Sequence, residues 1–158
     1  MDKTQAVRVG VLAALALGLL MAGNYFMSTN QGSESLTVSL PSGTQLKVEV
    51  ADSPLLLFSG MAFRDALPPA WGMLFIYEQP DFHKRNTRQY RVPVDIIWLD
   101  EGKHVLLIAE NVAPCETEKC PEYGPPREKD RYVIETHAGF ARREHLTPGA
   151  ELRFILQL

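Results

Sequence analysis

The sequence predicts an α+β fold that is mainly antiparallel β: a small barrel-like or rolled sheet with two short helices, preceded by one N-terminal transmembrane helix. Three observations lead to this prediction. An uncharged apolar run lies near the start of the chain. Beyond it, apolar and polar residues alternate with a period of two, which is typical of half-buried strands. Eleven Pro and eleven Gly mark frequent turns and therefore short strands.

Residues 9–27 form the apolar run, and they predict a transmembrane helix. A helix of this length covers roughly 28 Å, close to the hydrocarbon thickness of a bilayer. A cleaved signal peptide is the alternative, because Gly18, Gly23 and Asn24 weaken the second half of the run. Signal cleavage needs small residues at the −3 and −1 positions, and each candidate end places a large residue at −3. We therefore expect an uncleaved signal anchor.

The basic residues around this run predict its orientation. Lys3 and Arg8 precede it, and no further Lys or Arg occurs before Lys47. The positive-inside rule then leaves the N-terminus in the cytoplasm and exports the remainder, to the periplasm or the outside of the cell. The expected order is a cytoplasmic tail (1–8), a signal anchor in the cytoplasmic membrane (9–27), a polar tether (28–35) and an extracytoplasmic domain (36–158).

The exported domain begins with signals for a hairpin and a helix. Residues 36–40 and 46–50 alternate apolar with polar side chains, and Pro41-Ser42-Gly43 between them is typical of a turn, so we expect paired strands. Ser53 followed by Pro54 is typical of a helix start, with an N-cap and Pro at the first helical position. The sequence therefore predicts a helix over 54–61.

The run Val92–Asp100 is the most apolar and β-branched segment after the N-terminus, and it predicts a central strand. Glu101-Gly102-Lys103 predicts a tight turn into a strand over 104–112, which pairs antiparallel with it. The remaining expected elements are strands over 72–77, 131–136 and 151–158, a helix over 138–145 and a turn over 147–149.

Cys115 and Cys120 lie in a polar loop flanked by Pro114 and Pro121. In an exported domain this spacing predicts a disulfide that closes a small ring and stiffens the loop. A zinc site would need two further ligands at a metal spacing, and a redox pair is more often spaced Cys-x-x-Cys. We therefore expect no metal site here and no cofactor.

Several motifs occur together in order along residues 48–158: Gly60-Met-Ala-Phe-Arg64, Gly72-Met-Leu-Phe75, Val92-Pro-Val-Asp-Ile-Ile-Trp-Leu-Asp100, Glu110-Asn-Val-x-Pro114, Arg131-Tyr-Val-Ile-Glu135, Ala138-Gly-Phe140 and Pro148-Gly149. In these motifs the chain resembles the bacterial and archaeal family called domain of unknown function 192. The resemblance implies a compact, β-rich single domain, often exported behind a signal or an anchor. It implies no activity.

One stretch departs from the family pattern. Family members commonly read Phe-Trp-Met-Lys-Asn-Thr before the Pro-x-Asp strand. Here the corresponding residues are 85–90 without a gap, or 82–87 with a short insertion. Either alignment replaces the aromatic and Met positions with polar residues, so the resemblance implies a more polar pocket in this chain if that run lines one.

Asp95 lies within the apolar central strand, where an unpaired carboxylate would be costly. It must face a cation, backbone N–H donors or a cleft. As a functional group it would be a general acid or base with a raised pKa. We favour a structural ion pair with Arg64, and a third possibility is that Asp95 faces outward if Val94, Ile96 and Trp98 face the core.

Glu110 and Glu135 also interrupt apolar strands. With Asp95 they are candidates for the paired carboxylates of a glycosidase-type hydrolase, with Arg64 as a further candidate catalytic residue. The chain lacks the sequence motifs of nucleophilic hydrolases, of HExxH metalloproteases and of phosphate-binding glycine loops. The carboxylates therefore stand as the alternative catalytic site.

The segment 83–91 concentrates basic residues, and its candidate binding residues are Lys84, Arg85, Arg88, Tyr90 and Arg91. Such a cluster is able to bind an anionic polymer, lipid headgroups or an acidic protein face. The competing interpretation is a solvated edge strand whose charges prevent association.

The formal net charge of −3 argues against a nucleic-acid partner. Two functional hypotheses remain. The first is a membrane-tethered, non-enzymatic extracytoplasmic binding or accessory module, whose partners are the membrane through residues 9–27 and an envelope protein complex or anionic polymer. The second is a small cell-envelope hydrolase that uses Asp95 with Glu110 or Glu135.

Overall fold

The structure is a computed structural model, and it describes residues 15–19, 35–62 and 64–156. Residues 15–19 are helical. The predicted cytoplasmic tail lies outside the described residues, as do the predicted anchor apart from 15–19 and the predicted tether apart from Ser35. Within the described ranges, no helix is both long enough and apolar enough to cross a membrane.

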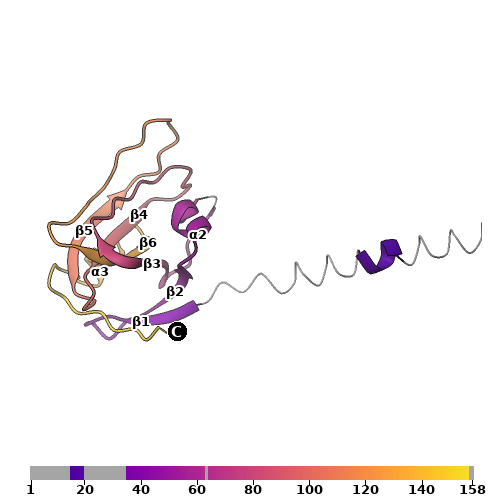
Figure 1. Cartoon of the computed structure of the whole chain (residues 1–158). Helices are drawn as coiled ribbons and strands as arrows, with labels where there is room; N and C mark the ends of the chain where they lie inside the picture. Colours follow the sequence, from indigo (N-terminus) through magenta and orange to yellow (C-terminus); the bar gives the residue numbers. More distant parts are fainter. Residues whose placement is uncertain (1–14, 20–34, 63, 157–158) are drawn as a thin grey trace, which may run out of the picture. The chain divides into compact units, whose positions relative to one another are not determined.

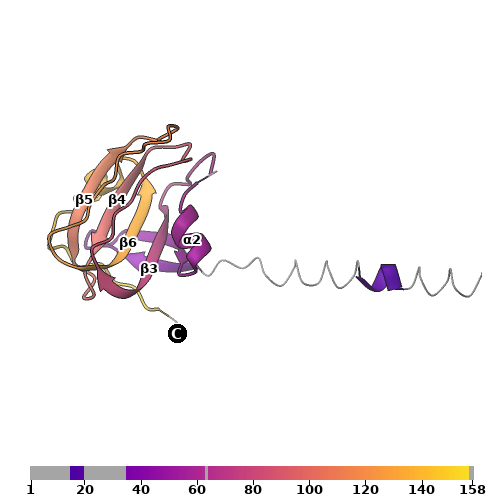
Figure 2. The ribbon, with the colours of Figure 1, turned by 45° about the horizontal axis from the view of Figure 1, so that its top comes forward.

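The domain is α+β, as predicted, and its sheet is mostly antiparallel. Six strands lie in the order β1-β2-β3-β6-β4-β5, and the β2–β3 pair is parallel. Figures 1 and 2 show the curved sheet, with β4 between β5 and β6 and with α2 beside β3. The strands are β1 (Ser35–Ser39), β2 (Gln45–Ala51), β3 (Trp71–Asp81), β4 (Val94–Leu99), β5 (Val105–Val112) and β6 (Asp130–His137).

Both predicted hairpins are confirmed. Strands β1 and β2 pair antiparallel with Ser35 opposite Glu49, and the turn between them uses Gly43 at a φ of 87°. Strands β4 and β5 pair antiparallel through the predicted tight turn, where Lys103 adopts a φ of 68°. These hairpins form from local signals, because alternation specifies the strands and the turn residues specify their connection.

The two helices of the domain are shorter than predicted. Helix α2 (Pro54–Ser59) begins as expected, with the Ser53 side chain accepting a hydrogen bond from the Leu56 N–H. It ends at Gly60, whose φ of 51° is readily adopted only by glycine. Helix α3 (Phe140–Arg143) is a single turn that follows Gly139.

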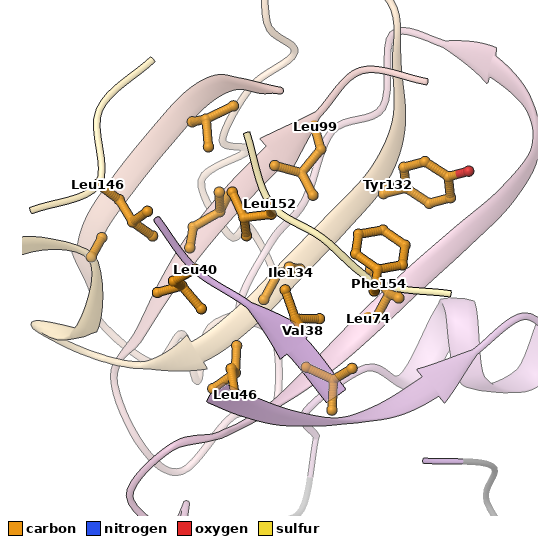
Figure 3. Packing of buried hydrophobic residues seen from close by; sticks show 14 of the residues in the cluster. Val38, Leu40, Leu46, Leu74, Leu99, Tyr132, Ile134, Leu146, Leu152 and Phe154 are labelled. Carbon is orange, nitrogen blue, oxygen red and sulfur yellow. The ribbon is translucent and has the colours of Figure 1, made fainter. Parts of the chain in front are cut away.

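Strand β4 is buried along its whole length, because both faces of the sheet are covered. Ile97 and Leu99 point into one apolar cluster, and Ile96 and Trp98 point into the other. The continuous apolar run of the sequence is therefore explained by burial on two sides rather than one. Figure 3 shows part of the first cluster, in which Leu152 and Phe154 lie with Val38 and Ile134.

The predicted closing strand over 151–158 is wrong. Within its described part, Glu151 makes an isolated bridge with His104, and Arg153 makes one with Ser39. Glu151 therefore bonds beside the start of β5, and Arg153 bonds to the end of β1. These two strands are the opposite edges of the sheet. With only one residue pair at each edge, the segment forms no continuous ladder, so the sheet has six strands rather than the seven expected.

Candidate functional site

A buried network of three polar side chains lies on the α2 side of the sheet. The Arg85 Nε donates to Glu135 Oε1 at 2.8 Å, and the Tyr90 hydroxyl donates to Glu135 Oε2 at 2.6 Å. Arg85 also donates to Tyr90 at 3.3 Å and to the Leu57 carbonyl of α2 at 3.0 Å. The guanidinium lies over the Phe75 ring, 3.8 Å from its centroid. The network thus connects β6, α2 and the segment that joins β3 to β4.

That joining segment is held by backbone hydrogen bonds on both sides. Arg85 exchanges two backbone bonds with Tyr123, at 3.0 and 2.8 Å. The Cys115 N–H donates to the Thr87 carbonyl at 3.0 Å, and the Thr87 hydroxyl donates to the Ala113 carbonyl at 2.7 Å. The segment is therefore a bonded loop and not the solvated edge strand that was the competing prediction for 83–91.

Burial and neighbouring charge together determine the protonation of the network. Burial, and after it the Glu135 carboxylate, raises the pKa of the Tyr90 phenol well above its ordinary value. Burial opposes the charge of Arg85, but the Glu135 carboxylate, together with Tyr90 and Tyr77, outweighs it and raises the pKa of the guanidinium. At neutral pH Tyr90 is a neutral donor and Arg85 is a cation, and both donate hydrogen bonds to the Glu135 carboxyl group.

An open groove of about 760 Å³ lies above this network. Leu55 and Phe58 of α2 line one wall, and Lys84 and Arg88 of the loop line another. The loop closed by the Cys115–Cys120 bond, called here the disulfide-closed loop, contributes residues 118–120. Arg85 and Tyr90 contribute to the base of the groove. The groove combines one apolar wall with polar walls, which suits an amphipathic ligand.

Helix α2 contributes four consecutive apolar residues, Leu55 to Phe58, and none of them is fully buried. Leu55 is 74% exposed and Phe58 is 89% exposed. Isolated exposed apolar residues are ordinary, but a cluster of them beside a groove is typical of interaction sites.

The predicted binding residues fall into two groups. Arg85 and Tyr90 are buried and bonded to Glu135, so they are structural parts of the groove rather than free cationic contacts. The exposed members have partners of their own. Lys84 lies 2.8 Å from the Glu122 carboxylate, Arg91 pairs with Asp65, and Arg88 donates to the Glu118 carbonyl. The charges of Lys84 and Arg91 are therefore matched by carboxylates, whereas Arg88 is bonded to an uncharged backbone carbonyl.

Asp95 is fully buried, and its partners are backbone N–H groups. It accepts hydrogen bonds from Asn111 at 2.8 Å, Gly139 at 3.1 Å and Ala141 at 2.8 Å. The expected ion pair with Arg64 is wrong, because Arg64 pairs with Glu49 at 2.5 Å. The outward orientation is also wrong, since both faces of β4 are buried. Asp95 joins β4 to β5 and to the start of α3.

The candidate catalytic carboxylates do not converge. Asp95 is opposite Thr136 in the β4–β6 register, and Glu135 is opposite Ile96. Paired residues on neighbouring strands point to the same face, so the Asp95 and Glu135 side chains lie on opposite faces of the sheet. Glu110 pairs with Arg142 at the surface, at 2.9 Å.

A third buried carboxylate, Asp130, was not singled out by the sequence. It accepts hydrogen bonds from the His83 backbone N–H at 3.0 Å and lies 2.9 Å from His83 Nδ1. The His83 ring stacks on Tyr77, with centroids 3.5 Å apart. Burial raises the pKa of Asp130, and the bonds from His83 act against that rise. The signal available in the sequence was an acid directly before an apolar strand.

The cysteines form the predicted bond: Cys115 and Cys120 are joined with an S–S distance of 2.15 Å. Their ring lies against the groove, since Cys120 lines it. No group of three or more His, Cys, Asp or Glu able to hold a metal ion is found in the part of the chain that the structure describes.

The chain is similar to two solved structures. A protein from Sinorhizobium meliloti 1021, described provisionally as a transcription regulator, is 27% identical with a TM-score of 0.70, over 78% of this chain and 95% of that one. A protein of unknown function from Novosphingobium aromaticivorans DSM 12444 is 28% identical with a TM-score of 0.65, over 75% and 83%. No curated protein matches the chain.

A family model also matches. Residues 37–154 fit the family DUF192, described as Uncharacterized ACR. This range contains all the motifs on which the resemblance rested and spans nearly the whole β-rich domain. The chain therefore belongs to the DUF192 family.

Proposed function

We propose that the protein is a non-enzymatic binding or accessory module, held by an anchor at residues 9–27 and working outside the cytoplasm. The groove between α2, the loop 84–90 and the disulfide-closed loop carries this proposal. Its volume of about 760 Å³ lies within the range of ligand sites in proteins. Its base is fixed by Arg85 and Tyr90, so the shape of the groove does not depend on the ligand.

The chemistry of the walls favours binding over catalysis. Arg85 and Tyr90 both donate hydrogen bonds to the Glu135 carboxylate. None of these three groups is therefore free to act as a general acid or a general base. Asp95 is bonded to three backbone N–H groups on the other face of the sheet. Nothing in this arrangement favours the hydrolase, which needs two carboxyl groups flanking one substrate bond.

An amphipathic envelope component fits the groove better than an anionic polymer. Leu55 and Phe58 offer apolar surface, while Lys84 has the Glu122 carboxylate as its partner. A polyanion would have to displace such partners. The same charge matching, with a net charge of −3, makes DNA an unfavourable ligand, so the description of the Sinorhizobium protein as a regulator does not extend to DNA binding by this chain.

Affinity purification of the full chain from native membranes in mild detergent tests this function. The variant Leu55→Ser with Phe58→Ser removes the apolar wall. Ile155→Ser is the matched control, because Ile155 is 83% exposed but does not line the groove. A component retained by the wild type and the control, but lost from the double variant, is the expected result. Identical components in all three samples would contradict the proposal.

A further inference from the structure

The apolar wall of the groove is concentrated on one side of α2. Leu55 and Phe58 are three positions apart, so they project from the same side of the helix. Both are mostly exposed, and α2 contains no fully buried residue and no charged residue. This helix therefore offers apolar side chains to a partner outside the domain.

The position of α2 relative to the point where the chain enters the domain indicates what that partner is. The chain enters β1 at Ser35, which lies opposite Glu49 of β2. Strand β2 ends at Ala51, and α2 starts at Pro54. The six Cα-to-Cα steps from Glu49 to Leu55 span at most about 20 Å even when the chain is extended. Helix α2 is thus near the entry point, and the β1–β2 turn is at the opposite end of that hairpin.

The chain before Ser35 limits how far the entry point lies from a membrane. Residues 28–34 contain no apolar side chain, and seven residues reach at most about 25 Å. With residues 9–27 in the bilayer, the entry point is held within that distance of the membrane surface. Helix α2 is then among the elements of the domain nearest to the lipid.

We propose that α2 contacts the surface of this same bilayer, and that Leu55 and Phe58 enter the boundary between headgroups and acyl chains. This inference rests on the proposed function and names the bilayer as the partner of the apolar wall. Lys84 and Arg88 then lie at headgroup level, where their existing partners, Glu122 and the Glu118 carbonyl, limit any preference for anionic lipid. The contact depends mainly on apolar insertion.

Site-specific fluorescence on the full chain tests the contact. The variant Phe58→Cys carries a polarity-sensitive fluorophore, and the chain is reconstituted in phosphatidylcholine vesicles. Thr147→Cys is the control, since Thr147 is exposed and lies three residues after Glu144, which bonds to Ser42 in the β1–β2 turn. The native cysteines are joined to each other, so the dye reacts with the introduced thiol.

We expect the emission of the fluorophore at position 58 to shift to the blue and to be quenched by nitroxide-labelled lipid. We expect neither effect at position 147. Leu55→Cys should behave like Phe58→Cys, and added phosphatidylglycerol should change the result little. Water-like emission at both 55 and 58, in a chain that the vesicles retain at alkaline pH, would overturn the contact between α2 and the bilayer. It would leave the anchor at residues 9–27 in place. Release of the chain at alkaline pH would overturn the tether as well. Shielding of position 58 in native membranes but not in lipid vesicles would replace the bilayer with a protein partner.

Discussion

The Nε atom of Arg85 lies 2.8 Å from the Oε1 atom of Glu135, and both side chains are buried beneath the groove. Fifty positions separate the two residues along the chain. The pair joins the most basic segment of the sequence to the middle of the sheet, and it makes part of a cationic cluster the base of the groove.

Arg85→Gln should destabilise the fold strongly, because it leaves Glu135 buried without its cation. Removal of one partner from a buried ion pair costs about 3–5 kcal/mol. Chemical unfolding of the full chain in detergent, followed by tryptophan fluorescence, measures the change. Lys84→Gln is the matched control: its exposed pair with Glu122 should contribute less than about 1 kcal/mol. Equal stability of the two variants would show that the buried pair does not stabilise the fold.

Asp95→Asn should also destabilise the fold, by about 3 kcal/mol, because an amide cannot accept the three backbone hydrogen bonds that the carboxylate accepts. Glu110→Gln, in an exposed pair with Arg142, should change stability by less than about 1 kcal/mol. Thermal unfolding of the two variants compares them. An Asp95→Asn protein that unfolds like the wild type would remove the structural role assigned to Asp95.

Gly60→Ala should cost more than Gly43→Ala, although both glycines have positive φ. A Cβ at position 60 would lie 2.5 Å from the Tyr90 hydroxyl and 2.7 Å from Arg85 Nη2, whereas one at position 43 meets nothing within 4 Å. We expect about 1 kcal/mol of backbone strain at Gly43 and roughly 3 kcal/mol or more at Gly60. Similar losses of unfolding free energy for the two variants would mean that the Arg85 and Tyr90 side chains can move to accommodate a Cβ at little cost.

Tyr90 should make the stability of the protein sensitive to alkaline pH. Its pKa in the folded state is raised above the unfolded value of about 10, so the unfolded chain loses the phenolic proton first. The stabilising contribution of Tyr90 is therefore complete below about pH 10 and declines above it. Tyr90→Phe should be less stable than the wild type at pH 8, by about 1–3 kcal/mol, and the difference should narrow at pH 11. A constant difference between the two pH values would contradict this assignment.

Reduction of the Cys115–Cys120 bond should loosen its loop without unfolding the sheet. The bond closes a ring with a sequence separation of only 5, so we expect it to stabilise the fold by about 2 kcal/mol. Lys119 lies inside the ring and is exposed. Trypsin should therefore cleave after Lys119 faster in reduced protein, as followed by mass spectrometry. Cleavage at the same rate in oxidised and reduced protein would show that the bond does not stiffen this loop.

The hairpins and the start of α2 could be predicted because their signals are local. Alternation over five residues, a Pro-Ser-Gly turn and a Ser-Pro cap each act on neighbouring residues. The prediction of a closing strand over 151–158 was wrong for the same reason, because it used only local signals. Leu152 and Phe154 alternate like a strand, but Glu151 and Arg153 bond to opposite sheet edges, which the local pattern does not reveal.

The site could be predicted only in part, because its contacts join residues that are distant in sequence. Asp95 was identified as a carboxylate within an apolar strand, with its orientation left open, and its donors at Gly139 and Ala141 lie 44 and 46 positions away. Glu135 and Arg85 were both identified, but for separate roles. A buried acid in an apolar strand needs a cation or hydrogen-bond donors, and the basic segment 83–91 was one possible source of the cation for Glu135. The order of β3, β6 and β4 in the sheet brings the two side chains together.

Photocrosslinking in intact cells tests the central claim, that the α2 groove is the binding site of this protein. A photoreactive amino acid replaces Phe58 in the full chain, and the control probe replaces Thr147, which is exposed, outside the groove and near the β1–β2 turn. The account predicts a defined lipid or protein adduct at position 58 and none at position 147. No adduct at position 58, or the same adducts at both positions, would contradict it.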